Sequence, residues 1–264
     1  MECISGLRIP DSGVISVLGL DPQADRAAVR ERVGVQLQES ALQPFVKVGE
    51  VLDLFASFYR QPADPAGLMD ALGLADKRDC SFRRLSGGLK QRLSIALALV
   101  GNPQIAILDE LTTGLDPQAR RDTWTLIEHV RDRGVTVILV THFMDEAERL
   151  CDRVMLIDHG QVAALDTPAG LAQQAGGGTH LRFIPSAPFP DRLLTLLAGV
   201  TGVEHEGQRI GVTGTGDLVT AVMRALQAAG VEVRELQVES ATLDDAYVRL
   251  IHHAGHDRKE ALRP

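Results

Sequence analysis

The stretch Leu85–Arg92, L-S-G-G-L-K-Q-R, decides the fold of this chain of 264 residues. Its serine and two glycines come directly before a helical pattern. Their backbone N–H groups are therefore expected at a helix N-terminus, where unpaired donors and the helix dipole favour an anion. Downstream, one apolar run ends in Asp109 and Glu110, and a second ends in Thr141 and His142. Because open α/β sheets bind ligands at the carboxyl ends of their strands, this order predicts an anion-binding α/β protein.

Apolar runs that alternate with helical patterns extend this arrangement along the chain. They predict parallel strands joined by crossover helices. The expected strands are 105–108, 135–140 and 154–157, and the expected helices are 91–101, 117–133 and 144–151. Upstream, apolar residues at helical spacing predict a helical subdomain between Gln38 and Ser86, with a stripe formed by Val51, Leu54, Phe55 and Phe58.

The composition changes at residues 175–179, A-G-G-G-T, which predicts a linker. The linker separates an α/β domain, residues 1–174, from a small α+β domain, residues 180–253, and a polar tail is expected at 254–264. The small domain is predicted to run strand, helix, strand, strand, helix, strand over 180–184, 189–198, 200–205, 208–213, 217–229 and 231–238, followed by a helix at 242–252. That order is typical of a ferredoxin-like fold.

Charge and cysteine content disfavour several classes of protein. A net charge of -8 argues against nucleic-acid binding, which depends largely on Lys and Arg. Cys3, Cys80 and Cys151 are too far apart for a disulfide framework or a C-x-x-C metal site, which favours a reducing cytosol. No apolar run approaches the roughly 20 residues that span a bilayer, and no signal-peptide pattern is present. Membrane attachment is therefore expected through another subunit.

Taken together, three motifs resemble those of the ABC-type ATPases. Leu85–Arg92 is similar to the ABC signature, Ile105–Glu110 to the Walker B strand, and Val137–His142 to the strand that carries the switch histidine. The resemblance covers residues 1–170 and implies a P-loop-type α/β nucleotide-binding domain with an inserted helical subdomain. It also implies ATP and Mg²⁺ as the bound ligands.

The resemblance assigns roles to single residues. Asp109 is expected to hold Mg²⁺, Glu110 to polarise the attacking water, and His142 to contact the γ-phosphate and organise that water. Contacts with the nucleotide are implied for the signature, through Ser86, Gly87, Gly88 and Gln91.

Two loops carry further expected contacts. Gln38 resembles the Q-loop glutamine that touches Mg²⁺ at the cofactor site and relays to the transport subunit; Gln36 is the alternative, and Gln38 is favoured because Glu39 follows it. Asp116 resembles the D-loop aspartate and is expected to address the nucleotide of a partner subunit. Leu111 stands where the family usually has proline, which predicts lower rigidity after the Walker B strand.

Within the family, the runs T-H-F-M-D-E-A-E at 141–148 and T-L-D-D-A-Y at 242–247 are similar to drug-export ATPases of the daunorubicin-resistance type. The resemblance implies an ATP-hydrolysing subunit of an ABC exporter. Such a subunit pairs with a second ATP-binding subunit, as a homodimer or heterodimer, and attaches to a separate transmembrane permease subunit. The chain is then expected in the cytoplasm, peripheral on the inner face of the cell membrane.

No G-x-x-x-x-G-K-[ST] phosphate loop, the Walker A motif, occurs in the sequence. By resemblance, Met1–Leu7 corresponds to the end of the helix that follows this loop, so the domain is expected to be truncated before residue 1. One interpretation is a misplaced start at an internal GTG codon. The other is an inactive or regulatory product that contributes only its signature surface to an intact partner. The nucleotide sequence upstream of codon 1 would separate the two.

Overall fold

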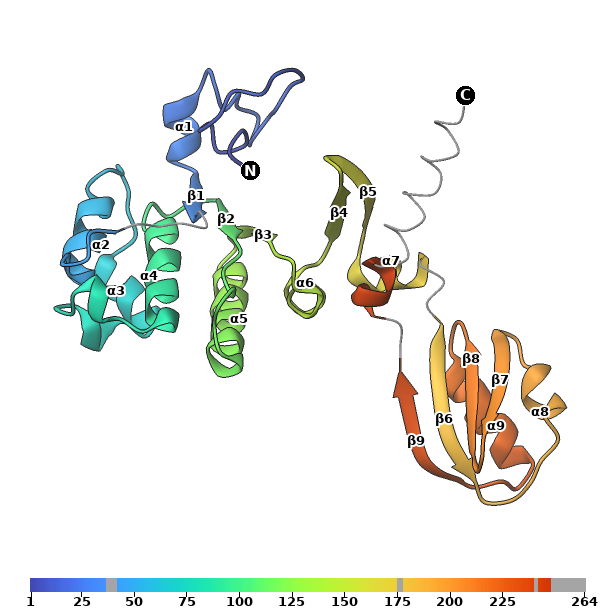
Figure 1. The fold of residues 1–264 in the computed structure, drawn as a ribbon. Helices are drawn as coiled ribbons and strands as arrows, with labels where there is room; N and C mark the ends of the chain where they lie inside the picture. Colours follow the sequence, from blue (N-terminus) through green and yellow to red (C-terminus); the bar gives the residue numbers. More distant parts are fainter. Residues whose placement is uncertain (37–41, 175–177, 240–241, 248–264) are drawn as a thin grey trace. The chain divides into compact units, whose positions relative to one another are not determined.

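The computed structural model describes residues 1–36, 42–174, 178–239 and 242–247, and Figure 1 shows their elements along the chain. The chain divides into two compact units, Met1–Glu146 and Ala147–Pro264. Each unit has its own sheet and its own buried apolar residues. The linker predicted at 175–179 does not coincide with the boundary between these units, which falls after Glu146. Residues 175–177 of that linker lie outside the described residues.

The first unit contains a parallel sheet of three strands in the order β1-β2-β3. These strands are β1 (Val33–Gln36), β2 (Ile105–Asp109) and β3 (Thr136–Val140). The central strand β2 is apolar and its three middle residues are buried, as a strand with neighbours on both sides requires. Because all three strands run in the same direction, their carboxyl ends meet at one edge of the sheet.

Glycine allows β1 to pack closely against a helix. A Cβ atom added to Gly34 would stand 1.8 Å from the carbonyl oxygen of Ala98, which lies in α4 (Gly87–Leu99). No other residue type leaves room for this approach. The short run V-G-V-Q was not foreseen as a strand, because it is only four residues long and glycine is depleted in strands.

Several helices accompany this sheet, and Figure 1 shows α2 (Val48–Ala56), α3 (Pro65–Ala71) and α4 grouped on one side of it. The predicted helices at 91–101 and 117–133 are confirmed. The first of them begins four residues earlier than expected, at Gly87. The helical elements of this unit are α1 (Arg26–Arg30), α2 (Val48–Ala56), α3 (Pro65–Ala71), the short turns Ala75–Lys77 and Phe82–Arg84, α4, and α5 (Pro117–Asp132).

The apolar stripe expected on α2 is only partly buried. The helix ends at Ala56, and Leu54 and Phe58 are 52% and 66% exposed. Val51 of the stripe is buried, and it shares the buried face with Val48 and Leu52, which the stripe did not include. Spacing within the sequence located the helix, whereas the direction of its neighbours determined which side is covered.

The expected parallel strand at 154–157 is wrong in its pairing. In the second unit, β4 (Val154–Asp158) pairs antiparallel with β5 (Gln161–Asp166) to form a two-stranded sheet. The two strands are joined through His159 and Gly160, which both have positive φ, 46° and 76°. A tight hairpin turn of this kind reverses the chain at once and leaves no room for a crossover helix.

The remaining helices before the last sheet are α6 (Met144–Leu150) and α7 (Pro168–Gln174). After them comes an antiparallel sheet with the order β7-β8-β6-β9. The elements follow the predicted succession as β6 (Thr179–Pro185), α8 (Arg192–Thr195), β7 (Val200–Glu206), β8 (Arg209–Gly214), α9 (Leu218–Ala228) and β9 (Val233–Glu239).

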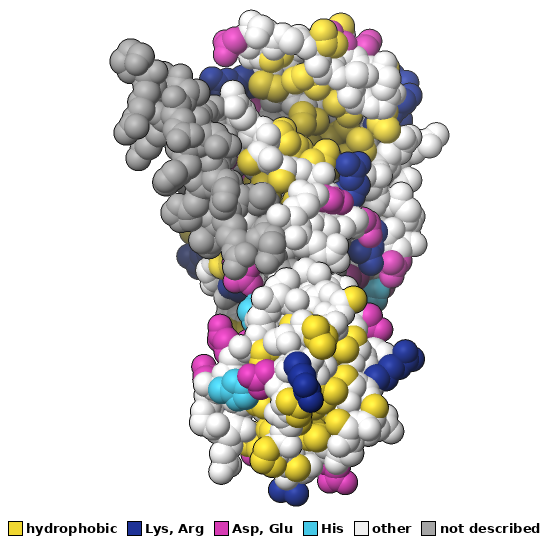
Figure 2. Space-filling view, turned by 90° about the vertical axis from the view of Figure 1, so that its right-hand side faces the viewer, with side chains coloured by type: hydrophobic (Ala, Val, Ile, Leu, Met, Phe, Trp, Pro, Cys, Tyr) yellow, Lys and Arg dark blue, Asp and Glu magenta, His cyan; other side chains and the backbone are white. Residues whose placement is uncertain are grey.

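The core of this last sheet joins alternate strand residues to one face of α9. Leu181 and Phe183 of β6 pack with Val222 and Leu226 of α9, and all four are essentially buried. The helix expected at 189–198 is shorter than predicted, and residues 243–247 are helical at the start of the helix expected at 242–252. In the lower part of Figure 2, hydrophobic side chains lie exposed among charged ones on the side that carries α8.

None of the helices in the described residues combines the length and the apolar character that crossing a membrane requires.

Candidate functional site

The carboxyl edge of the parallel sheet brings four predicted or competing site residues together. Gln36 ends β1, Asp109 ends β2, and Glu110 follows directly. The register pairs Asp109 with Val140, so that Glu110 and His142 leave neighbouring strands at the same edge. The backbone N–H of Glu110 donates to the Val140 carbonyl at 2.8 Å, which extends the ladder by one residue.

Gln36 supports the end of β2 from the neighbouring strand. It is 6% exposed, and its Oε1 accepts a hydrogen bond from the backbone N–H of Asp109 at 3.1 Å. This contact fixes the position at which Asp109 leaves the sheet. Gln38, favoured from the sequence, lies outside the described residues, so its expected contact with Mg²⁺ stays a prediction.

Asp109 is in an unfavourable place for a negative charge. Burial raises the pKa of its carboxyl group above the ordinary value, and the adjacent Glu110 carboxylate raises it further. A cation beside the two carboxylates would offset both effects. The residues present therefore fit a divalent metal ion.

Glu110 and His142 form the second pair at this edge. Glu110 Oε1 lies 3.6 Å from His142 Nδ1, and the two side chains are 27% and 55% exposed. Glu110 has a φ of 48°, in the left-handed region that costs a non-glycine residue about 1–2 kcal/mol. Leu111 is fully buried, and its side chain anchors the segment where lower rigidity was expected.

The signature lies at the start of α4. Ser86 is the N-cap residue, and its Oγ accepts a hydrogen bond from the Leu89 N–H at 3.4 Å. Neither glycine that follows has a positive φ, and Cβ atoms added at positions 87 and 88 would make ordinary contacts of 3.8 and 3.4 Å with Leu115 and Ala119. Packing therefore does not require glycine at either position, whereas close approach of an anion to the helix N-terminus would.

Two other predicted residues, Asp116 and Gln91, lie in this region, and only the first has hydrogen-bond partners for its side chain among the described residues. Asp116 caps α5, because its Oδ1 accepts from the backbone N–H groups of Gln118 and Ala119 at 3.0 and 2.9 Å. Gln91 lies on α4, and its buried Nε2 has no hydrogen-bond partner among the described residues. The expected nucleotide contacts of Asp116 and Gln91 stay predictions.

Comparison with known proteins identifies the relatives of this chain. The daunorubicin resistance ATP-binding protein DrrA3 of Streptomyces coeruleorubidus is 33% identical over 268 residues, which cover 98% of this chain and 84% of the relative. The chain belongs to the ATP-binding proteins of the ABC transporter family. The family model for ABC transporters matches residues 1–113.

Other members extend this assignment. The Nod factor export ATP-binding protein I of Burkholderia orbicola is 41% identical over 183 residues, covering 67% of this chain and 60% of the relative. A solved ATP-binding subunit of an ABC transporter superposes with a TM-score of 0.59 at 26% identity, over 66% of this chain and 75% of that one. The nucleotide-binding domain fold of the ABC family is thus present, together with an additional C-terminal region rich in strands.

The structure separates the predicted site of this ABC protein into two places. Asp109, Glu110 and His142 converge at the sheet edge, whereas Ser86–Gly88 and Asp116 lie together at the starts of α4 and α5. Sequence reasoning missed Gln36 as the residue that supports Asp109. The spacing carried no signal for this role, because it depends on which residue of β1 stands opposite Leu108.

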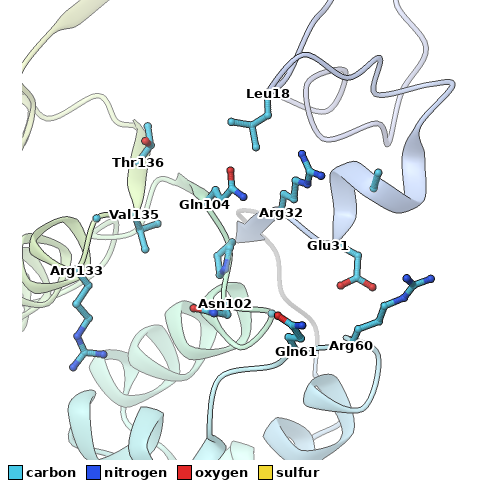
Figure 3. A pocket seen from close by; sticks show the side chains of 14 residues that line it. Leu18, Glu31, Arg32, Arg60, Gln61, Asn102, Gln104, Arg133, Val135 and Thr136 are labelled. Carbon is cyan, nitrogen blue, oxygen red and sulfur yellow. The ribbon is translucent and has the colours of Figure 1, made fainter.

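A cleft of about 810 Å³ lies at the opposite edge of the same sheet. It is bordered by Arg32, Gln104 and Thr136, which stand at the beginnings of the three strands. Figure 3 shows that the guanidinium groups of Arg32, Arg60 and Arg133 point away from one another. They do not converge on one anion, so this cleft is not the phosphate site of the ABC fold.

Proposed function

We propose that this chain is the ATP-binding and ATP-hydrolysing subunit of an ABC exporter. The observation that carries the proposal is the Glu110–His142 pair beside Asp109 at the carboxyl edge of the parallel sheet. Two curated relatives are named for daunorubicin resistance and for Nod factor export, which favours export of a small molecule by this chain as well.

The proposed chemistry is mostly positioning and electrostatics. Asp109 and Gln38 would hold Mg²⁺, which would neutralise charge on the phosphate oxygens. The Glu110 carboxylate polarises the attacking water by accepting a hydrogen bond from it, and His142 orients that water toward the γ-phosphate. At 3.6 Å the two side chains are close enough to act on one water molecule.

The second half of the site comes from another subunit. Ser86, Gly87 and Gly88 present the N-terminus of a helix of 13 residues, and their exposure leaves it open to a nucleotide held by that subunit. Asp116 and Gln91 would complete this face. The partners are a second ATP-binding subunit, identical or related, and a transmembrane permease subunit that places the pair at the cytoplasmic face of the membrane.

The finer organisation follows the same proposal. Helices α2 and α3 form the inserted helical subdomain, because they stand in the chain between β1 and the signature helix. Residues 180–253 form a ferredoxin-like accessory domain, which the sheet order β7-β8-β6-β9 supports. Residues 1–174 form the ATPase domain, 175–179 the linker and 254–264 a tail.

The proposal is tested by Glu110→Gln in the purified subunit. The amide cannot accept a proton from water, so turnover should fall at least a hundredfold while ATP binding persists. Glu206→Gln, an exposed substitution in β7, is the matched control. Hydrolysis at the parental rate in Glu110→Gln would refute the assigned role.

A second candidate function is that of a non-catalytic module, which offers its signature surface, with Ser86 and Gly87 exposed, to an intact partner. Titration of the purified chain with ATP, alone and with an intact partner subunit, separates the two. Binding that requires the partner supports the module, and tight binding without it excludes the module.

A further inference from the structure

Helix α5 contacts the segment that carries the switch histidine through two residues on one helical face. Arg120 and Trp124 are four positions apart, which places both side chains on the same side of the helix. The guanidinium carbon of Arg120 lies 4.2 Å from the centroid of the Phe143 ring. The Phe143 ring in turn lies 4.1 Å from the imidazole of His142, centroid to centroid, at an angle of 39°.

Trp124 makes the second contact one turn further along. Its indole Nε1 donates to Glu146 Oε1 at 2.9 Å, and Glu146 is completely buried. Arg120 also forms an ion pair of 3.7 Å with Asp145, which further fixes the first turn of α6 against α5. The residues that follow His142 are thus held by α5 at three successive points.

Within the part of the chain that the structure describes, few other contacts fix the imidazole. Its side chain is 55% exposed, and the contact with Glu110 is long for a hydrogen bond at 3.6 Å. A half-exposed ring can adopt several rotamers, each separated by small energies. The contact with the Phe143 ring restricts them, and the Arg120 cation over that ring restricts Phe143.

We propose that Arg120 and Trp124 are positioning residues that hold the His142 imidazole in register with Glu110, acting through Phe143 and Glu146. This inference rests on the proposed function and adds to it two residues that lie outside the motifs described above. Loss of either contact frees the imidazole to leave the water it orients. Turnover then falls, whereas nucleotide binding is maintained by other residues.

The first experiment measures the position of the imidazole directly, by aromatic NMR of the full chain. The ring protons of His142, assigned by comparison with His142→Gln, are shifted by the ring current of Phe143. Arg120→Met keeps the apolar stem but removes the cation, and should move these resonances toward their random-coil positions. Arg121→Met changes the same charge on an exposed neighbour and should leave them unmoved.

Arg120→Lys keeps a cation and should restore part of the shift. Unchanged His142 resonances in Arg120→Met, at parental thermal stability, would overturn the proposal. The proposal would also be overturned if Arg121→Met moved the His142 resonances as far as Arg120→Met does, because the effect would then reflect net charge alone.

The second contact has a reporter of its own, since Trp124 is the single tryptophan of the chain and gives one indole N–H resonance. Glu146→Ala removes the acceptor, so the indole proton should exchange faster with solvent and the His142 resonances should move. Glu146→Gln retains an acceptor oxygen and should keep both near the parental values. Faster indole exchange without any movement of His142 would show that the contact only stabilises the fold.

Kinetics supply the functional outcome. In the hydrolysing subunit, Arg120→Met should lower kcat about tenfold or more with little change in KM for ATP. Parental kcat despite displaced His142 resonances would overturn the proposed role in turnover. If no variant hydrolyses ATP, including the parental chain, the proposed function fails, while the NMR measurements still decide whether Arg120 and Trp124 position the imidazole.

Discussion

Glu110 has a left-handed backbone conformation that few residues with a side chain adopt, with a φ of 48°. Such strain persists only where the surroundings fix it, and here the Glu110 N–H donates to Val140 while Leu111 is buried beside it. The strain brings the Glu110 carboxylate to His142. The same turn keeps Asp109 at the end of the sheet, where its charge is poorly solvated.

Asp109 should make stability depend on pH. Its pKa is raised by burial and by Glu110 from 3.8, so the folded state binds the proton more tightly than the unfolded state. Ionisation therefore destabilises the fold: the cost is absent below 3.8, grows as the pH rises through the folded-state pKa, and is complete above it.

Asp109→Asn removes this cost and should raise the melting temperature at pH 7 by about 1–3 °C in the absence of metal. The difference from the parental chain should vanish at low pH, where both side chains are neutral. Thermal unfolding measured at several pH values checks this, with Asp11→Asn, at an exposed loop position, as the control. The predicted sign would be contradicted if the difference in melting temperature, variant minus parental chain, were smaller at pH 7 than at pH 3.

At the scale of elements, the packing of β1 on α4 depends on one glycine. A methyl group at Gly34 would stand 1.8 Å from the carbonyl oxygen of Ala98, and backbone on both sides must move to admit it. Gly34→Ala should therefore destabilise the first unit by about 3 kcal/mol. Denaturant unfolding followed by circular dichroism, which reports both units, measures the loss.

The control for this substitution is Gly202→Ala, in β7. The nearest atom to an added Cβ there is 3.9 Å away, so the variant should match or slightly exceed the parental stability. Equal effects of the two substitutions would mean that strand glycines matter by flexibility alone. The close approach of β1 to α4 would then make no separate contribution to the free energy of unfolding.

The sequence predicts some elements well because their signals are local. Helix α5 has a proline at its first position, an aspartate cap and sustained periodicity, and it begins where expected. The strands before Glu110 and His142 are uninterrupted apolar runs. These features placed Asp109, Glu110 and His142 at strand ends without knowledge of the neighbours.

Other features depend on neighbours and could not be predicted in this way. The covered face of α2 is set by what packs on it, and the antiparallel pairing of β4 is set by the turn at His159. The role of Gln36 follows from strand register. The contact of Arg120 with Phe143 links a residue of α5 to one 23 positions later, directly before α6. Spacing along one element contains no record of such pairs.

At the scale of the whole molecule, each compact unit has an apolar core built from its own residues. Phe183, in the second unit, is 1% exposed within a cluster that includes Leu181 and Val212. The single tryptophan, Trp124, lies in the first unit. Fluorescence therefore reports the unfolding of one unit, whereas circular dichroism reports both.

Phe183→Ala should separate these two signals. Removal of a buried aromatic side chain costs about 3–5 kcal/mol, so the second unit should unfold at a lower temperature, seen by circular dichroism. The fluorescence transition of Trp124 should stay where it is in the parental chain. The reciprocal control is Leu93→Ala, at a fully buried position of α4, which should lower the fluorescence transition. If Phe183→Ala lowers both transitions equally, the two units unfold as one, and the separation of cores seen in the fold is not a separation in stability.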